Sequence, residues 1–540
     1  MDARAPDPEA ERRAITRRSG VVMLGTLGSR VLGAVRDAVI AASFPLLATD
    51  AFFVAWTIPN TLRSLLGEGG VQAAFIPVFT DLDEREGRER ARVYFQRFAG
   101  ALLVVLVVVS AIGVWTAPAW ATLYAAGYRD DADKFDVTAR LTALVFPYLV
   151  FAGVAALLAG VLNARSRFLA AAFSPALLNV GLIAGALLLV PVAIALGEPP
   201  IVALAWGALA GGLLQVASQL PSLRATGMLA RPRFDLGDPA VRRSFLLLAP
   251  LLLGTGVYQL NVLLSRLLAS FLPHGAQSFL YYAQRLVEIP QGMFALAVAS
   301  AALPSLARYS SRGEHAEVKA TLRHSLRLSL FIAVPASIAL ATLATPIVTV
   351  VFARGEFGPA EVAGTARALT WMALGIWAIG SVYPVVRVFY AYNDTRTPVL
   401  CSALNLAVFV NVSLAWMPSM QHQAIALATS IASFAQLVLL LLLLRRRLGP
   451  LGLAEVARAF ARCVVASAVM AGAAHAVTRF GHWERGGNDP KNLAVMAVTV
   501  GVALVAYVLA SRALRSTELS EILSSARGRR GGPDAATRNP

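Results

Sequence analysis

Long apolar stretches separated by short polar loops constrain this chain more than any other feature. A helix of ~20 mostly apolar residues spans a bilayer, and fourteen such stretches can be placed along the 540 residues. They lie at 20–44, 50–80, 96–118, 139–162, 169–193, 200–220, 244–272, 277–306, 325–352, 366–391, 398–417, 422–444, 457–478 and 492–511. Because backbone polar groups inside a bilayer must be satisfied internally, the pattern predicts an all-α polytopic membrane protein with fourteen transmembrane helices.

The composition agrees with this fold class and excludes several functions. Hydrophobic residues make up 57% of the chain and charged residues only 15%, whereas soluble proteins carry about 25% charged residues. The net charge is +17, but no basic and aromatic recognition motif accompanies it, so we expect no nucleic-acid partner. Cys401 and Cys463 lie in apolar surroundings and the six histidines lack zinc-ligand spacing, so we expect no disulfide, metal or other cofactor.

The loop charges alternate along the chain and predict the orientation. Basic residues gather in the N-terminal tail, in the loops 81–97, 163–168, 222–243, 307–327, 392–397 and 445–456, and in the C-terminal tail. The alternate loops 45–49, 194–199, 273–276 and 418–421 contain no Lys or Arg, and YRDDADKFD at 128–136 is net acidic. By the positive-inside rule both termini are cytoplasmic. Since no loop exceeds about 25 residues, we expect no soluble catalytic domain.

The two halves of the chain resemble each other at a spacing of 226–227 residues. Four anchors repeat in the same order: Pro77 with Pro304, Gly87 with Gly313, 162–164 with 389–391, and Asn179 with Asn405. Six spans per repeat predict two lobes related by a pseudo-twofold axis along the membrane normal, with a site at their interface. The predicted division is a cytoplasmic tail (1–19), an N-lobe (20–221), a cytoplasmic linker (222–243), a C-lobe (244–444), two further spans (445–512) and a disordered cytoplasmic tail (513–540).

Charged residues inside the first two spans of each half, or near them, mark the candidate site. They are Arg30, Arg36, Asp50, Arg63, Glu68, Arg285 and Glu288. A central charge costs ~2.5–3.5 kcal/mol on insertion scales, so such residues face a cavity or a partner. The planar fork of arginine suits phosphate oxygens, which predicts a wet cavity that binds an anion such as a diphosphate. The alternative is that these residues form ion pairs that only join helices, as Arg285 and Glu288 can at i, i+3.

Two of these spans also contain residues that break helices. GEGG in the second span places Gly67, Gly69 and Gly70 together, and Pro59 and Pro290 lie within the second and eighth spans. Proline removes a backbone hydrogen bond, and irregular backbone at membrane depth is tolerated where it lines a cavity or is buried in protein. We therefore expect these five residues to act as hinges.

Four stretches resemble one known family. SRVLGAVRDAVIAASF, TDAFFVAWTIPNTLRSLLGEGGVQAAFIPVF, YYAQRLVEIP and AYNDTRTPV are similar to the MurJ/MviN family of the MOP exporter superfamily, over roughly residues 20–510. The resemblance implies a flippase that moves the peptidoglycan precursor lipid II, an undecaprenyl-diphosphate disaccharide-pentapeptide, to the outer leaflet of the bacterial cytoplasmic membrane. It implies a cationic cavity whose essential residues match the seven charged residues named above.

The resemblance also bears on lipids, partners and departures from the family. It implies that the last two spans form a groove for the lipid tail. We expect membrane lipids as partners of the chain, with the cell-wall synthesis machinery as a further candidate partner. Relatives often carry an acid where this chain has Gln284. The seventh span contains no acidic residue, so a sodium site that relies on a carboxylate there is not predicted.

Three other functions remain open at this point. A multidrug or ion antiporter of the same superfamily would favour twelve spans and an acidic cavity. A membrane-embedded polyprenyl-phosphate transferase needs positioned acids or a metal, for which Asp130, Asp131 and Asp133 are the available residues; we interpret their run as a solvated loop. A scaffold within the cell-wall machinery is the fourth function. The residues favour a transporter and not an enzyme.

Overall fold

The structure is a computed structural model that describes residues 28–67, 70–254, 256–291 and 296–528. Within these ranges the regular elements are helices, and ten of them are long and apolar enough to cross a membrane. Each of the ten overlaps one predicted span, from Arg88–Trp115 to Pro490–Ala513. The all-α polytopic fold is therefore confirmed. The other four predicted spans include residues outside the described ranges, so the count of fourteen stays a prediction.

The chain divides into two compact units, Met1–Gln277 and Ser278–Pro540, and we describe each by itself. The first unit begins with a helix over residues 28–43. It continues with α2 (Leu46–Gly67), α3 (Gly70–Arg85), α4 (Arg88–Trp115), α5 (Ala117–Ala125), η1 (Ala126–Asp130), α6 (Ala132–Val145), α7 (Tyr148–Ala164), α8 (Phe168–Ala184), η2 (Gly185–Leu189), α9 (Val190–Ala195), α10 (Val202–Ala225), α11 (Pro239–Gly254) and α12 (Gly256–Ser270).

The second unit contains most of α13 (Ala276–Pro290) and all later helices. These are α14 (Leu296–Ser311), α15 (His315–Thr342), α16 (Ala344–Phe352), α17 (Pro359–Ala373), α18 (Ile376–Ala391), α19 (Arg396–Met420), α20 (His422–Leu448), α21 (Ala454–Thr478), η4 (Trp483–Arg485), α22 (Pro490–Ala513) and α23 (Thr517–Gly528). Since α11 packs on α3 and α4, and α12 on α5 and η1, residues 239–270 belong to the first unit. The predicted lobe boundaries rest on the sequence repeat and stay a prediction.

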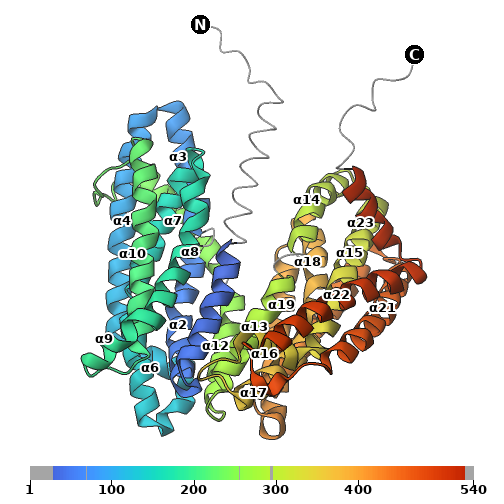
Figure 1. Cartoon of the computed structure of the whole chain (residues 1–540). Coiled ribbons are helices and arrows are strands. Elements are labelled where there is room, and N and C mark those ends of the chain that lie inside the picture. Colours follow the sequence, from blue (N-terminus) through green and yellow to red (C-terminus); the bar gives the residue numbers. More distant parts are fainter. Residues whose placement is uncertain (1–27, 68–69, 255, 292–295, 529–540) are drawn as a thin grey trace. The chain divides into compact units, whose positions relative to one another are not determined.

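Aromatic side chains form the core of the first unit. α3 packs against α4 and α7, and α4, α7 and α10 run side by side (Figure 1). The ring of Phe75 stacks on Phe79 and on Tyr94, with ring centroids 5.2 and 5.3 Å apart, and Phe98 closes the same cluster. Because aromatic pairs contribute about 0.5–1.5 kcal/mol beyond their buried area, this cluster holds α3 firmly to its neighbours.

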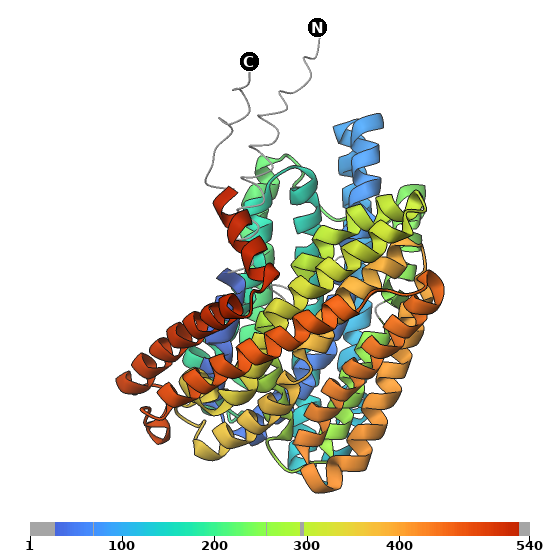
Figure 2. The ribbon, with the colours of Figure 1, turned by 90° about the vertical axis from the view of Figure 1, so that its right-hand side faces the viewer.

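The last two spans pack on the second unit through α15. α21 lies against α15 along its length, and α21 and α22 run side by side as an orange-red and a red helix (Figure 2). The hydroxyl of Tyr507 on α22 donates to the backbone oxygen of Phe331 on α15, at 2.7 Å. Both helices also carry exposed apolar residues, such as Val469 on α21 and Leu504 on α22. These residues suit contact with lipid.

The sequence repeat reappears in the lengths and ends of the helices. α4 and α15 both have 28 residues, and α5 and α16 both have 9. Gly87 precedes α4 with φ 88°, and Gly313 precedes α15 with φ 71°. α7 and α18 end at the repeated anchors, and each is followed by a residue of positive φ, Ser166 and Asn393. The anchors therefore mark equivalent turns in the two units.

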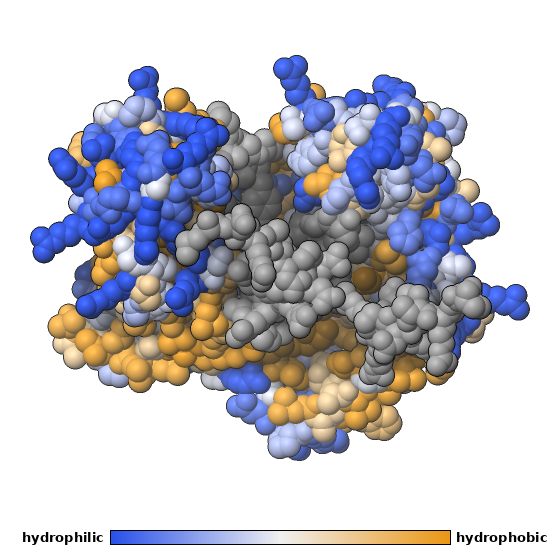
Figure 3. Space-filling model, turned by 90° about the horizontal axis from the view of Figure 1, so that it is seen from above, coloured by the Kyte–Doolittle hydropathy of each residue, from blue (hydrophilic) through white to orange (hydrophobic). Residues whose placement is uncertain are grey.

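Hydrophilic residues gather at one end of the helices in each unit. In the first unit, blue hydrophilic residues gather at the end where α3 turns into α4 (Figure 3). In the second unit, taken by itself, they gather at the end where α14 turns into α15. Each unit thus has a polar end above an apolar band.

Candidate functional site

Arg36 and Asp37 form a buried ion pair on the helix over residues 28–43. Nε and Nη2 of Arg36 donate to Oδ1 of Asp37 at 2.9 and 2.6 Å. The third nitrogen, Nη1, donates to Oδ1 of Asn179 on α8 at 2.9 Å, and Nδ2 of Asn179 donates to the backbone oxygen of Ser29 at 3.0 Å. The side chain of Arg36 is 11% exposed and that of Asp37 is 3% exposed. The guanidinium is therefore held in one orientation by a carboxylate and an amide.

The sequence analysis identified Arg36 but missed the residue that orients it. Asn179 entered that analysis only as an anchor of the repeat, and its equivalent Asn405 donates to Gln436 on α20 at 3.1 Å. Gly33, one turn before Asp37, faces Asn179 at 3.8 Å from an ideal Cβ position. Arg30 is exposed. The repeat itself was the signal that these two asparagines have equivalent places.

α2 carries four of the predicted residues, Asp50, Pro59, Arg63 and Gly67. Nε of Arg63 donates to Oδ1 of Asn60 at 3.1 Å, and the side chain is half-buried. Pro59 lies inside α2, which continues to Gly67, and α3 begins at Gly70. Glu68 and Gly69 lie outside the described residues. The two ends of the predicted hinge, Gly67 and Gly70, are therefore the last residue of α2 and the first of α3.

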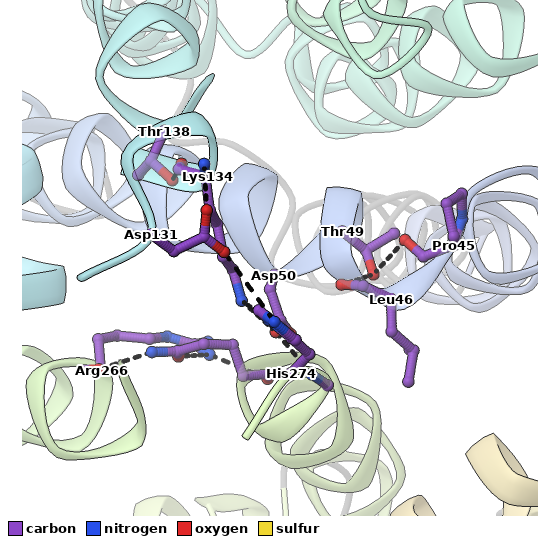
Figure 4. A network of polar contacts seen from close by, with 11 residues as sticks. Pro45, Leu46, Thr49, Asp50, Asp131, Lys134, Thr138, Arg266 and His274 are labelled. Carbon is purple, nitrogen blue, oxygen red and sulfur yellow. Dashed lines mark hydrogen bonds and ion pairs between the residues drawn. The ribbon is translucent and has the colours of Figure 1, made fainter. Parts of the chain in front are cut away.

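Asp50, near the start of α2, is the centre of a second buried network (Figure 4). Nζ of Lys134 on α6 donates to Oδ2 of Asp50 at 3.0 Å, and the backbone N–H of Gly275 donates to the same oxygen at 2.7 Å. The side chains of Lys134 and Asp50 are 2% and 1% exposed. In this structure the carboxylate of Asp50 therefore accepts from two donors within the first unit.

The run YRDDADKFD is exposed at Asp130 and Asp133, as predicted, but its interpretation as a solvated loop was wrong for Tyr128 and Lys134. Tyr128 is buried in η1, and Lys134 is buried against Asp50. Asp131 is the N-cap of α6, because its Oδ1 accepts from the backbone N–H of Lys134 at 3.1 Å. The hydropathy pattern does not predict the burial of Lys134, because a lysine in an acidic segment is expected to be exposed. Its partner Asp50 lies 84 residues away in the sequence.

Arg285 and Glu288 lie on α13 in the second unit. Nη1 of Arg285 donates to Oε2 of Glu288 at 2.6 Å, and the two side chains are 35% and 42% exposed. The guanidinium carbon lies 4.8 Å from the centre of the Tyr281 ring. Nε2 of Gln284 donates to Oε1 of Glu288 at 3.5 Å, a bond that an ionised acid at position 284 cannot make.

A small cavity lies beside the end of α13. Pro290 is the last residue of that helix, and the cavity is lined by Pro290, by Ser329 on α15 and by Gly380 on α18, with apolar neighbours. The cavity measures about 10 Å³, which is room for about one water molecule.

The comparisons with known proteins identify the family. The sequence profile described as "Lipid II flippase MurJ" matches residues 43–486, well over half of the chain. The chain belongs to the MurJ family of lipid II flippases. A "Probable lipid II flippase MurJ" of Vibrio cholerae is 35% identical over 84% of this chain and 88% of its own length. A "Lipid II flippase MurJ" of Burkholderia cenocepacia is 33% identical over 83% of this chain and 87% of its own length.

Solved structures agree on the fold. A structure described as "Lipid II flippase MurJ, inward closed conformation" matches 91% of this chain and 99% of its own with a TM-score of 0.73, at 22% identity. An inward-facing MATE transporter of the MOP superfamily matches 82% of this chain and 99% of its own with a TM-score of 0.64, at 12% identity. The MurJ family therefore shares its architecture with these more distant transporters.

Proposed function

We propose that this chain is a transporter that flips lipid II across the bacterial cytoplasmic membrane. The family match over residues 43–486 carries this conclusion, because relatives named for that activity align over more than four-fifths of both chains. The peptidoglycan role follows from the substrate. The likeness to MATE transporters, at 12% identity, concerns the fold alone and does not favour an antiporter.

The diphosphate of the substrate would be bound by arginines. Arg30, Arg36, Arg63 and Arg285 are the proposed contacts, with Glu68 and Glu288 balancing their charge in the empty carrier. Asp50, which was predicted to share that role, is paired with Lys134 in this structure. The support is chemical: Arg36 is oriented by Asp37 and Asn179, and Arg285 is part-exposed beside Glu288. An oriented guanidinium loses less entropy when it binds phosphate oxygens bidentately.

The membrane arrangement is part of the same proposal. Both termini would be cytoplasmic, the two six-helix lobes would rock about the bound headgroup, and α21 and α22 would guide the lipid tail. The exposed apolar faces of α21 and α22 support the last point. Contact with the cell-wall synthesis machinery is proposed on the substrate alone, because the enzymes that use lipid II act at the same membrane surface.

The test is rescue of bacterial cells depleted of their own flippase, with outer-leaflet lipid II as the readout. We expect this chain to restore exposure and Arg285→Ala to lose it, with Arg285→Lys intermediate because an ammonium lacks the planar fork. Arg367→Ala is the matched control, since Arg367 is exposed on α17 and donates within its own helix, to the backbone oxygen of Ala363. Failure of the well-inserted wild-type chain to rescue would overturn the proposed substrate.

The hinge residues Gly67, Gly69, Gly70, Pro59 and Pro290 would let α2, α3 and α13 bend during transport. We expect Gly69→Ala combined with Gly70→Ala to slow flipping several-fold while lipid II binding survives, because alanine favours continuous helix by about 1 kcal/mol per residue. Gly472→Ala is the control, since a Cβ there meets open space. Unchanged transport in the double variant would refute the hinge.

A further inference from the structure

Lys134 is the buried member of a set of three lysines. Lys319 is half-buried and Lys491 is exposed, whereas Lys134 is 3% exposed. Removing an ammonium from water costs several kcal/mol unless it is paired and hydrogen-bonded. The site that accepts Lys134 must therefore compensate for that cost with specific contacts.

Three contacts surround the ammonium of Lys134. It donates to Oδ2 of Asp50 at 3.0 Å and lies 4.1 Å from the centre of the Tyr128 ring. It also lies 3.2 Å from Nδ1 of His274, in the segment between α12 and α13 (Figure 4). The backbone of Lys134 is held as well, since its N–H binds Asp131 and its oxygen accepts from Thr138 at 2.7 Å. The lysine is thus a fixed point and not a flexible side chain.

These contacts join three segments that the charge pattern assigns to one side of the membrane. Asp50 follows the loop 45–49, Lys134 lies in 128–136, and His274 and Gly275 lie in 273–276. Oδ2 of Asp50 accepts from both Lys134 and the N–H of Gly275. Lys134 neutralises the carboxylate, and the carboxylate holds the residue that leads directly into α13, the helix of Arg285 and Glu288.

His274 makes this arrangement sensitive to protonation. An ammonium has no lone pair, so Nδ1 of His274 must accept from Lys134, and the ring proton lies on Nε2, 4.0 Å from Oδ2 of Asp131. A protonated ring carries hydrogen on both nitrogens, which turns the Lys134 contact into a repulsion. The ring is 60% exposed and so is open to protons from the medium.

The charges around His274 decide the direction of the effect. Lys134 places a positive charge beside the ring, and Asp50 on α2 and Asp131 at the start of α6 place negative charges near it. Arg266 on α12 is engaged with Gln277, whose Oε1 accepts from it at 3.2 Å. Protonation therefore places two cations beside each other over the Asp50 carboxylate, and it weakens the hold of Lys134 on that carboxylate.

We propose that Lys134 is a positioning residue for Asp50, and that with His274 it forms a latch that holds residues 274–275 to α2 and α6 and loosens on acidification. The latch rests on the proposed function only in the experiment that measures transport. Its geometry is tested directly through the amide of Gly275, whose exchange with solvent is slow while it is bonded to Asp50.

The experiment is hydrogen exchange of the full chain in lipid nanodiscs, at about pH 8 and about pH 5.5, the range in which histidines titrate, corrected for intrinsic exchange rates. We expect protection of the segment around Gly275 to fall about tenfold at the lower pH, which corresponds to about 1.4 kcal/mol. His274→Gln keeps an acceptor oxygen but does not titrate, so its protection is expected to be equal at both pH values.

Two variants test the role of Lys134: one removes its charge and the other keeps it. Lys134→Met is expected to lose protection at both pH values, and Lys134→Arg to retain most of it. The matched controls are Lys491→Met and His482→Gln, which break an exposed lysine–histidine contact of 2.9 Å elsewhere and are expected to leave the segment unchanged. Should Lys134→Met fail to fold, the Arg and His274 variants still decide the question.

Two outcomes would overturn the proposal. One is wild-type protection around Gly275 that does not change with pH, or that changes equally in His274→Gln. The other is full protection in a folded Lys134→Met. Because exchange is measured without substrate, these failures are distinct from a failure to rescue flipping. In rescued cells, the latch predicts a pH profile of lipid II exposure that His274→Gln flattens.

Discussion

At the residue scale, buried charges in this protein occur in groups that share one carboxylate. Asp238, just before α11, is fully buried in its side chain and accepts from Nη1 of Arg90 and Nη1 of Arg97, both at 2.9 Å. Burial by itself raises the pKa of Asp238, but bonds from Arg90, the N–H of Ala240 and Arg97 outweigh burial and lower its pKa to about 2. The predicted linker 222–243 is therefore clamped onto α4.

The lowered pKa of Asp238 determines the pH range in which its carboxylate stabilises the folded state. A carboxylate whose pKa is lower in the folded state stabilises that state above its unfolded pKa of about 3.9, and the stabilisation is lost as the pH falls through the folded value. We expect Asp238→Asn to lower the melting temperature by roughly 2–4 °C, by an equal amount at all pH values between about 5 and 8. Thermal unfolding in detergent measures this, and a difference that grows with pH would contradict it.

At the element scale, glycines set how closely two helices approach. α8 and α10 cross at Gly181, Gly185, Gly207 and Gly211, and a Cβ on Gly181 would lie 2.5 Å from the backbone oxygen of Gly207. Small residues let membrane helices pack backbone to backbone. The turn of π-helix η2, which begins at Gly185, lies on the same contact. This packing fixes the helix that presents Asn179 to Arg36.

A valine at this crossing should push the helices apart. We expect Gly181→Val to cost about 1–3 kcal/mol, as overpacking does, and to reduce the yield of folded protein. Gly501→Val on α22 is the control, because a Cβ there meets nothing within 4 Å. Fluorescence-detected size-exclusion chromatography with heating compares the two variants. Equal stability of both would show that α8 and α10 are not held by this contact.

At the scale of the whole molecule, we expect charge to couple transport to the membrane potential. The chain carries a net charge of +17, and its proposed substrate contacts are arginines. Each charge that crosses 100 mV changes the free energy by ~2.3 kcal/mol. A potential that is negative on the cytoplasmic side should therefore return the empty carrier toward that side.

We expect lipid II flipping in vesicles to speed up several-fold when a valinomycin-set potassium gradient makes the cytoplasmic side negative. Reversing the gradient should slow flipping below the rate at zero potential, and dissipating it should restore that rate. Protein-free vesicles under the same gradients give the background. A rate that is indifferent to both gradients would refute coupling to the potential.

The sequence by itself determined the helical membrane fold, the repeat and most of the charged candidates. These are local properties, because a run of apolar residues predicts a span and a charge within it is costly wherever the helix packs. The matched lengths of α4 and α15 and the paired turns at Gly87 and Gly313 agree with this reading.

Only the tertiary structure decided which charge meets which partner. Arg36 meets Asn179 across 143 residues, Asp50 meets Lys134 across 84, and Arg90 meets Asp238 across 148. No sequence period encodes such pairs, since they depend on how helices far apart in the chain are packed. For the same reason the acidic run at 128–136 was misjudged: the burial of Lys134 is a property of the fold around it, not of its neighbours in sequence.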